Sequence, residues 1–110
     1  VTMQMGAHGN MMGLGAHWEM ELFTHGSFSN YDAIEIATIN GFKHHGLDHI
    51  LGSIEPGKLA DMVIMTKNPL ENIRNSRSIE YVVKNGVIYS GTDAARVYPD
   101  PRPAEKLYFK

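Results

Sequence analysis

The sequence predicts an α/β fold that forms part of a larger protein, and three observations support this prediction. Residues 1–50 have the pattern of a strand, a loop and helices. Residues 51–91 instead have the pattern of short strands joined by turns. The chain begins at Val1, without an initiator Met, and enters an apolar run at once. Because a single strand cannot satisfy its own backbone hydrogen bonds, the first half needs neighbouring strands from elsewhere.

The composition is that of one packed domain and excludes several classes of function. Of 110 residues, 43% are hydrophobic and 20% are charged, so we do not expect disorder along the whole chain. Ten basic and twelve acidic side chains give a net charge of −2, which offers no basic surface to nucleic acid or an anionic membrane. The chain has no Cys, which excludes disulfides and thiolate sites. Without a recognisable membrane span or signal peptide, we expect a soluble protein of the cytoplasm or periplasm.

A short strand, a loop and an amphipathic helix are predicted at the start of the chain. Large and polar residues alternate over residues 1–5 and are followed by Gly, which is typical of a strand that ends in a loop. The loop, residues 7–15, is rich in Gly but lacks the order of a phosphate-binding motif. A helix is expected from Ala16 to near Gly26, with one buried face. That face consists of apolar residues at steps of four, joined by Phe23: Leu14, Trp18 and Leu22.

A second helix is predicted to begin after Ser29, whose hydroxyl can cap the first free backbone N–H groups. Asp32, three residues later, adds a negative charge at the positive end of this helix. Residues 31–39 are apolar over most of the circumference, which indicates a nearly enclosed helix. We expect the helix to continue or re-form over residues 42–45 and to end at Gly46, where a positive φ is needed.

The second half of the chain is predicted to form strands. Residues 55–58 have Pro and Gly in the positions that a type II turn requires. Residues 60–66 are an apolar run, which indicates a buried strand, and Asn68-Pro69 ends it. Asp61, near the start of this strand, is expected to accept hydrogen bonds from backbone N–H groups.

A hairpin is the strongest local pattern in the sequence. Residues 79–84 and 87–90 flank Asn85-Gly86, which tolerates the two positive φ angles of a type I′ turn. The turn fixes the register of the ladder, and the predicted partners are Val83 with Ile88, Val82 with Tyr89, and Lys84 with Val87.

The remaining residues, 92–110, are predicted to form an extended tail rich in Pro and aromatic side chains. Three Pro within five residues cannot lie inside a helix. We expect the aromatic end of the tail, residues 107–109, to dock on another surface. The chain therefore divides at the sequence level into segments 1–50, 51–91 and 92–110.

His8 is the leading candidate for chemistry, because it comes just after the end of the first predicted strand. In barrels and open parallel sheets, functional groups gather at this end of the strands. The neighbours Ala7 and Gly9 are small and leave the imidazole accessible. We expect His17 to face the same opening. For both residues the alternative is a structural role, as a His bonded to nearby groups.

The other patterns do not indicate a site. The sequence contains no H-x-H, H-E-x-x-H or G-x-S-x-G motif. The seven Met are expected to fill the core. Four further His stand near predicted helix ends, where imidazoles commonly meet the last carbonyl groups, and we expect them to be structural or solvated: His25, His44, His45 and His49.

Several segments of the chain carry a family resemblance. They are LGSIEPGKLADMVI at residues 51–64, NPL at 68–70, VVKNGVIY at 82–89 and, upstream, DAIEIATING at 32–41. In order and spacing they resemble the C-terminal end of metal-dependent amidohydrolases of the imidazolonepropionase and dihydroorotase type. A narrower set of segments resembles the branch in which the amidohydrolase is fused to a TolB-like propeller. These segments are GAHG at residues 6–9, GLGAHWE at 13–19 and the tail.

The resemblance implies a TIM-like barrel and a small composite β-sandwich. This chain would supply the last barrel strand, the helices that follow it and the C-terminal sandwich strands. The family implies one or two divalent metals, zinc being expected here, and a metal-bound water that attacks an amide-type C–N carbon. The final barrel strand of the family usually carries an Asp, and His8 falls at that position. We therefore expect His8 to be a catalytic residue and an atypical metal ligand, and His17 to bind substrate.

By itself, the chain is expected to lack most metal ligands and to be inactive. Its expected partners are the remainder of its own barrel and sandwich and a small-molecule substrate. We expect a homo-oligomer, and we expect no binding to nucleic acid or to a membrane. Two alternatives to a hydrolase segment are an independent α+β binding module and a tail that completes the sheet of another chain. The missing sheet partners count against the binding module.

Overall fold

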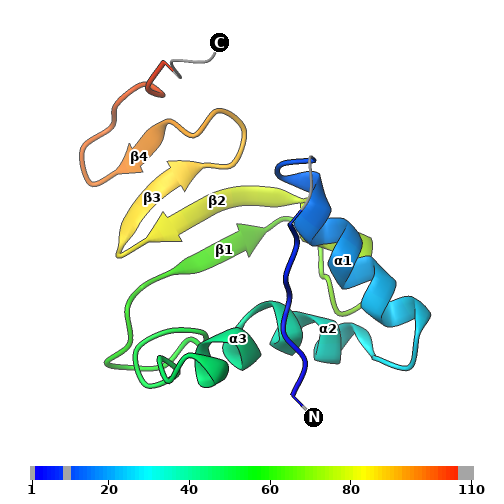
Figure 1. Ribbon diagram of the computed structural model, residues 1–110. Helices are drawn as coiled ribbons and strands as arrows, with labels where there is room; N and C mark the ends of the chain where they lie inside the picture. The colour runs from blue at the N-terminus through cyan, green and yellow to red at the C-terminus, as the bar shows by residue number, and fades with distance from the viewer. Residues whose placement is uncertain (1, 9–10, 107–110) are drawn as a thin grey trace.

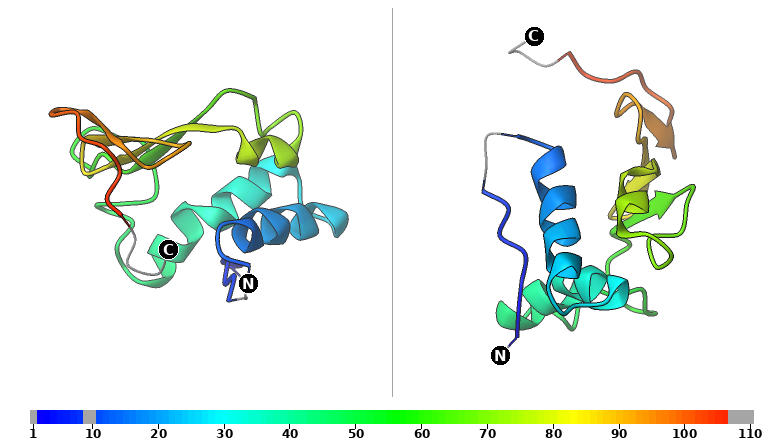
Figure 2. Two further views of the ribbon diagram at one scale, coloured as in Figure 1. Left: turned by 90° about the horizontal axis from the view of Figure 1, so that it is seen from above. Right: turned by 90° about the vertical axis from the view of Figure 1, so that its right-hand side faces the viewer.

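The computed structural model describes residues 2–8 and 11–106 and consists of helices followed by an antiparallel sheet (Figure 1). In chain order the elements are α1 (Leu14–His25), α2 (Asn30–Ala37), α3 (Ile39–His44), β1 (Met62–Met65), the 3-10 helix η1 (Ile73–Arg77), β2 (Ile79–Lys84), β3 (Val87–Ser90) and β4 (Arg96–Tyr98). The strands lie in the order β1-β2-β3-β4. The sheet lies beside the helices, and η1 contacts both α1 and β1 (Figure 2). The predicted α/β character is therefore confirmed.

The second helix begins as its sequence predicts. The Ser29 hydroxyl accepts a hydrogen bond from the Asp32 backbone N–H at 3.1 Å, and the Asp32 carboxylate accepts one from the Ser29 N–H at 2.8 Å. This reciprocal pair is a capping box, which satisfies two N–H groups at the start of α2. The helix breaks at Thr38 and re-forms as α3, which ends before Gly46 at a φ of 69°. Within the described residues, no helix is long and apolar enough to cross a bilayer.

The hairpin and its register are also confirmed. Asn85 and Gly86 have φ angles of 48° and 80°, as a type I′ turn requires. Val83 pairs with Ile88, Val82 with Tyr89 and Lys84 with Val87. The predicted turn over residues 55–58 is present as well, because the Lys58 N–H donates to the Glu55 carbonyl at 3.2 Å and Gly57 has a φ of 91°.

The main apolar cluster lies where α1, α2 and η1 meet. Its buried members come from each of these three elements: Met20, Ala33 and Ile73. Partly buried side chains surround it, among them Met5 from the N-terminal segment and Phe23 from the end of α1. The Phe23 ring meets the Phe28 ring edge-on, with centroids 5.8 Å apart. This cluster holds the N-terminal segment, both longer helices and η1 together.

The N-terminal segment does not form the predicted strand. Residues 2–8 have no regular secondary structure, and none of the strands β1 to β4 pairs with them. A strand exists through hydrogen bonds to a neighbour, and an alternating pattern alone does not provide one. The segment instead runs past α1 (Figure 1).

Three predictions of burial are wrong. The seven Met do not all fill the core, because Met3, Met11 and Met12 are 39%, 51% and 93% exposed. On α1 the stripe of Leu14, Trp18 and Leu22 is exposed, with Leu22 at 64%, and the buried residue is Met20 on another face. In β1, Val63 and Ile64 are 47% and 40% exposed, because β1 is an edge strand with β2 as its neighbour. The sequence pattern identified both elements as apolar, but no described residue covers these faces.

The tail contributes a strand that its composition does not predict. Residues 96–98 form β4 and pair with β3, and Arg96 and Arg102 exchange two backbone hydrogen bonds of 3.0 Å. The tail therefore folds back on itself after its Pro-rich turn. The predicted docking of residues 107–109 lies outside the described residues.

Candidate functional site

Two successive residues, Met5 and Gly6, hold the N-terminal segment against the helices. The Met5 side chain packs on the apolar cluster. The Gly6 N–H donates a hydrogen bond of 2.9 Å to Oε1 of Glu19, on the second turn of α1. The exposed Ala7 methyl lies 4.0 Å from the place where a Cβ on Gly15 would stand, which is an ordinary van der Waals distance. His8 follows directly after these contacts and is exposed.

The described residues do not form a metal centre by themselves. A hydrolytic zinc is usually held by three protein ligands, with water in the fourth position. Within residues 2–8 and 11–106, no group of three His, Asp or Glu is arranged to hold a metal. The described donors therefore include no complete set of ligands, and we derive no chemical step through a metal.

His17 is directed toward η1. Its Nδ1 and the hydroxyl of Ser76 share a hydrogen bond of 2.8 Å, and Ser76 is 1% exposed. Burial and, to a smaller extent, the positive charge of Arg77 lower the pKa of His17, so the ring is neutral at physiological pH. One ring nitrogen is thus engaged in the packing of α1 on η1. A role of His17 in substrate binding stays a prediction.

A charged cluster beside His17 joins the same two elements. The carboxylate of Glu21, on α1, pairs with Arg74 at 2.6 Å and with Arg77 at 3.3 Å, both on η1. It also lies 3.9 Å from the His25 ring, one turn along the helix. The hydrogen bond from Arg74, together with the nearby positive charges, lowers the pKa of Glu21. Nothing local in the sequence predicts this cluster, because Arg74 and Arg77 stand 53 and 56 positions from Glu21.

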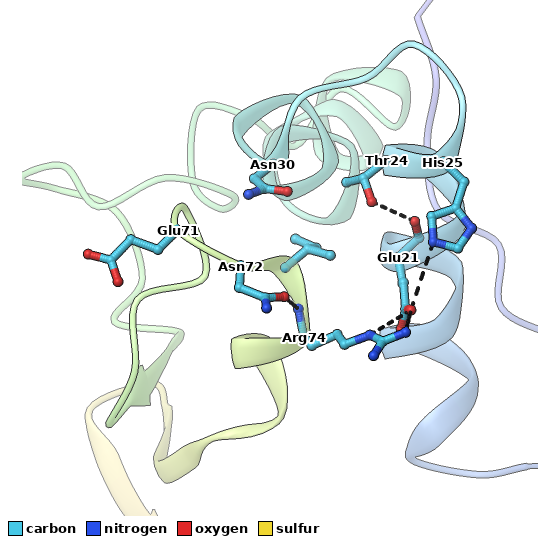
Figure 3. A pocket seen from close by; sticks show the side chains of 8 residues that line it. Glu21, Thr24, His25, Asn30, Glu71, Asn72 and Arg74 are labelled. Atoms are coloured by element: carbon cyan, nitrogen blue, oxygen red, sulfur yellow. Dashed lines mark hydrogen bonds and ion pairs between the residues drawn. The ribbon is translucent and has the colours of Figure 1, made fainter.

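The cavity beside this cluster has a volume of about 350 Å³ and opens between α1, the start of α2 and η1 (Figure 3). Several of its polar groups already have partners within the fold. The Thr24 hydroxyl donates to the Glu21 carbonyl at 2.7 Å, and Oδ1 of Asn72 accepts from the Arg74 N–H at 3.0 Å. The arrangement clamps η1 onto α1 and has no nucleophile beside a general base. Sequence reasoning did not single out Glu21, Arg74 or Arg77.

The remaining His residues lie at the surface of the described part of the chain. His25, His44, His45 and His49 are exposed. The rings of His44 and His45 meet edge-on at the end of α3, with centroids 5.3 Å apart. None of the four belongs to a group of three metal-ligating side chains within the described part of the chain.

Comparison with known proteins assigns the chain to a family. The sequence profile of the amidohydrolase family matches residues 2–89, so the chain belongs to that family. Guanine deaminase of Escherichia coli (strain K12) is 39% identical over 72 residues, which cover 64% of this chain and 16% of the deaminase. Adenine deaminase of Desulforamulus reducens is 48% identical over 54 residues, which cover 49% of this chain and 8% of that protein.

Solved structures agree with this assignment. The structure of molinate hydrolase superimposes with a TM-score of 0.71 and 30% sequence identity, covering 88% of this chain and 21% of the hydrolase. The predicted resemblance to amidohydrolases is thus confirmed at the level of the family. The chain spans about a sixth of the length of the guanine deaminase and less of the adenine deaminase.

Proposed function

We propose that this chain is the C-terminal part of a metal-dependent hydrolase that cleaves C–N bonds of small molecules. The observation that carries the proposal is the family match over residues 2–89. The deaminases it resembles, named for guanine and adenine, act on C–N bonds, which supports this reaction class. The metal is proposed to be zinc, and most of its ligands would come from residues outside this chain.

The proposed place of the chain is the last strand and helices of a TIM-like barrel, together with strands of a composite sandwich. Apolar faces that this chain leaves exposed support the proposal, because soluble proteins rarely keep such faces in water: Leu14, Trp18 and Leu22 on α1, and Val63 and Ile64 on β1. The remainder of the barrel and sandwich would cover them. The same proposal includes fusion to a TolB-like propeller and assembly into a homo-oligomer. It includes no binding to nucleic acid or to membranes.

His8 is the residue that we propose to act in the reaction. It is exposed at the end of a segment anchored to α1, so its imidazole is accessible to a substrate. A neutral imidazole can accept a proton near neutral pH or ligate a metal. Substrate identity would be determined by loops outside this chain.

The experiment is to replace His8 with Ala in the complete enzyme. The kcat/KM should fall by roughly a hundredfold or more, as expected when a general base is lost, with little change in the melting temperature. The assay is ammonia release from a panel of C–N substrates that includes guanine and adenine, with the metal content measured on the same samples.

His45→Ala is the matched control, because His45 is an exposed His at the end of α3. It should change stability at most and leave kcat/KM as it is. A His8→Ala enzyme with full metal content and wild-type turnover would remove His8 from the proposed site.

A further inference from the structure

The Glu19 carboxylate has an unusual environment. Its Oε1 accepts the Gly6 N–H at 2.9 Å, whereas its Oε2 is buried and has no hydrogen-bond partner among the described residues. Burying a carboxylate oxygen without a partner costs free energy. Another interaction of the Glu19 side chain is therefore expected to offset this cost. The hydrogen bond to Gly6 is the interaction that the structure shows.

The bond to Gly6 fixes a segment that has no sheet neighbour to fix it. Residues 2–8 make no strand contact with β1 to β4, so their path depends on local anchors. A charged acceptor makes a stronger bond to a backbone N–H than a neutral one does. Met5 packs on the apolar cluster directly before Gly6, so this contact and the Gly6 hydrogen bond together determine where the chain leaves for His8.

We propose that Glu19 is a positioning residue, which holds the segment from Gly6 to His8 against α1 and thereby orients the His8 imidazole. The inference rests on the proposed function in one respect, namely that His8 acts in the reaction. Gly6 is two residues from His8, and consecutive Cα atoms are about 3.8 Å apart, so a shift at Gly6 is transmitted to the imidazole. A misplacement of about 1 Å can cost roughly a hundredfold in rate.

The test combines variants of Glu19 with His8→Ala in the complete enzyme. Glu19→Ala should lower kcat by about tenfold or more in the wild-type background. In the His8→Ala background the same change should alter kcat by less than about twofold, because residues that act through one another are not additive. Glu19→Gln keeps an oxygen acceptor for Gly6 and should restore kcat to within about threefold of wild type.

Glu21→Gln is the matched control, because Glu21 is also a carboxylate on α1 but faces Arg74 and Arg77. It should lower the melting temperature without changing kcat. A residue that merely supports the fold would behave in the same way, so the loss of kcat in Glu19→Ala and its rescue in Glu19→Gln distinguish positioning from packing.

Hydrogen exchange provides a readout that does not depend on activity. The Gly6 amide should exchange about tenfold faster in Glu19→Ala than in wild type, and at nearly the wild-type rate in Glu19→Gln. Unchanged exchange, unchanged kcat in Glu19→Ala, or an equal loss of kcat in both His8 backgrounds would overturn the inference. Wild-type kcat in His8→Ala alone would instead reject the catalytic role of His8, while faster Gly6 exchange would still establish that Glu19 holds the segment.

Discussion

Asp61 joins the start of β1 to the turn between β2 and β3. Its Oδ1 accepts the Asn85 N–H at 2.7 Å, and its Oδ2 pairs with Nζ of Lys84 at 2.5 Å. The Ala60 carbonyl accepts the Gly86 N–H at 3.0 Å, beside this pair. The predicted role of Asp61, as an acceptor of backbone hydrogen bonds, is therefore confirmed, and the ladder between β1 and β2 is extended as far as the turn.

Asp61 should make stability depend on pH in the acid range. The hydrogen bond from Lys84, followed by that from the Asn85 backbone, lowers the pKa of Asp61 in the folded protein. The resulting stabilisation is fully present above the unfolded-state pKa of about 3.9 and is lost as the pH falls through the lower folded-state pKa. In the complete enzyme, Asp61→Asn should therefore melt at a lower temperature than wild type at neutral pH, with a difference that shrinks in acid.

The control for this prediction is Asp48→Asn, because Lys58 binds the backbone carbonyl of Asp48 and that contact survives the substitution. Thermal unfolding of all three proteins between about pH 3 and 7 provides the measurement. Equal melting temperatures for wild type and Asp61→Asn at neutral pH, or a difference that grows in acid, would contradict the assignment.

At this scale, the partner of a residue could be predicted where it is close in sequence, whereas distant partners could not be identified. Ser29 and Asp32 form a capping box within four positions, so the pattern itself contains both partners. His17 and Ser76 stand 59 positions apart, and only the packing of η1 on α1 brings them together. The hypothesis for His8 depended on a predicted strand that ends at Gly6, as well as on a family resemblance, and the segment that carries His8 has no regular secondary structure.

The hairpin between β2 and β3 is the element in which sequence and structure agree most fully. The reason is physical: Asn85 and Gly86 tolerate positive φ at little cost, and the turn type then fixes every pair along the ladder. Gly86→Val places a β-branched side chain at a φ of 80° and should destabilise the complete enzyme by about 1 kcal/mol or more. Chemical denaturation measures this difference in the free energy of unfolding, when both proteins show the same dependence of that free energy on denaturant concentration.

Glu80→Val is the control for the hairpin prediction, since it introduces the same side chain at an exposed position inside β2. Val suits a strand, so this change should stay within about 0.5 kcal/mol of wild type. If Gly86→Val and Glu80→Val unfold at the same denaturant concentration, the turn does not impose the conformation described above.

The helix α1 shows why periodicity identified an element but not its buried face. Leu14, Trp18 and Leu22 form a true apolar stripe, and a helix over this region is confirmed. The face that is buried within this chain is instead the one that meets α2 and η1 through Met20. Periodicity reports which residues are apolar, whereas the partner of each face depends on the tertiary arrangement.

At the scale of the whole molecule, the described residues have a small core. The apolar residues that are buried come from α1, α2, η1 and β2: Met20, Ala33, Ile36, Ile73 and Val83. Soluble domains of this size ordinarily bury most of the surface that their unfolded chains expose. The exposed stripe of α1 and the edge strand β1 are therefore the faces that the proposal assigns to contact with the remainder of the enzyme.

Substitutions at Leu22 can test whether the remainder of the proposed enzyme covers the apolar stripe of α1. It is 64% exposed within this chain, and a charge at such a surface position would ordinarily change stability by less than about 0.5 kcal/mol. If neighbouring barrel elements cover the stripe, Leu22→Asp buries an unpaired charge and should destabilise the complete enzyme by about 2 kcal/mol or more. Leu22→Met keeps the volume and the apolar character and should cost less than about 1.5 kcal/mol at the same site. Thermal unfolding of the complete enzyme compares the two variants, and equal stabilities would show that Leu22 faces water there as it does within this chain.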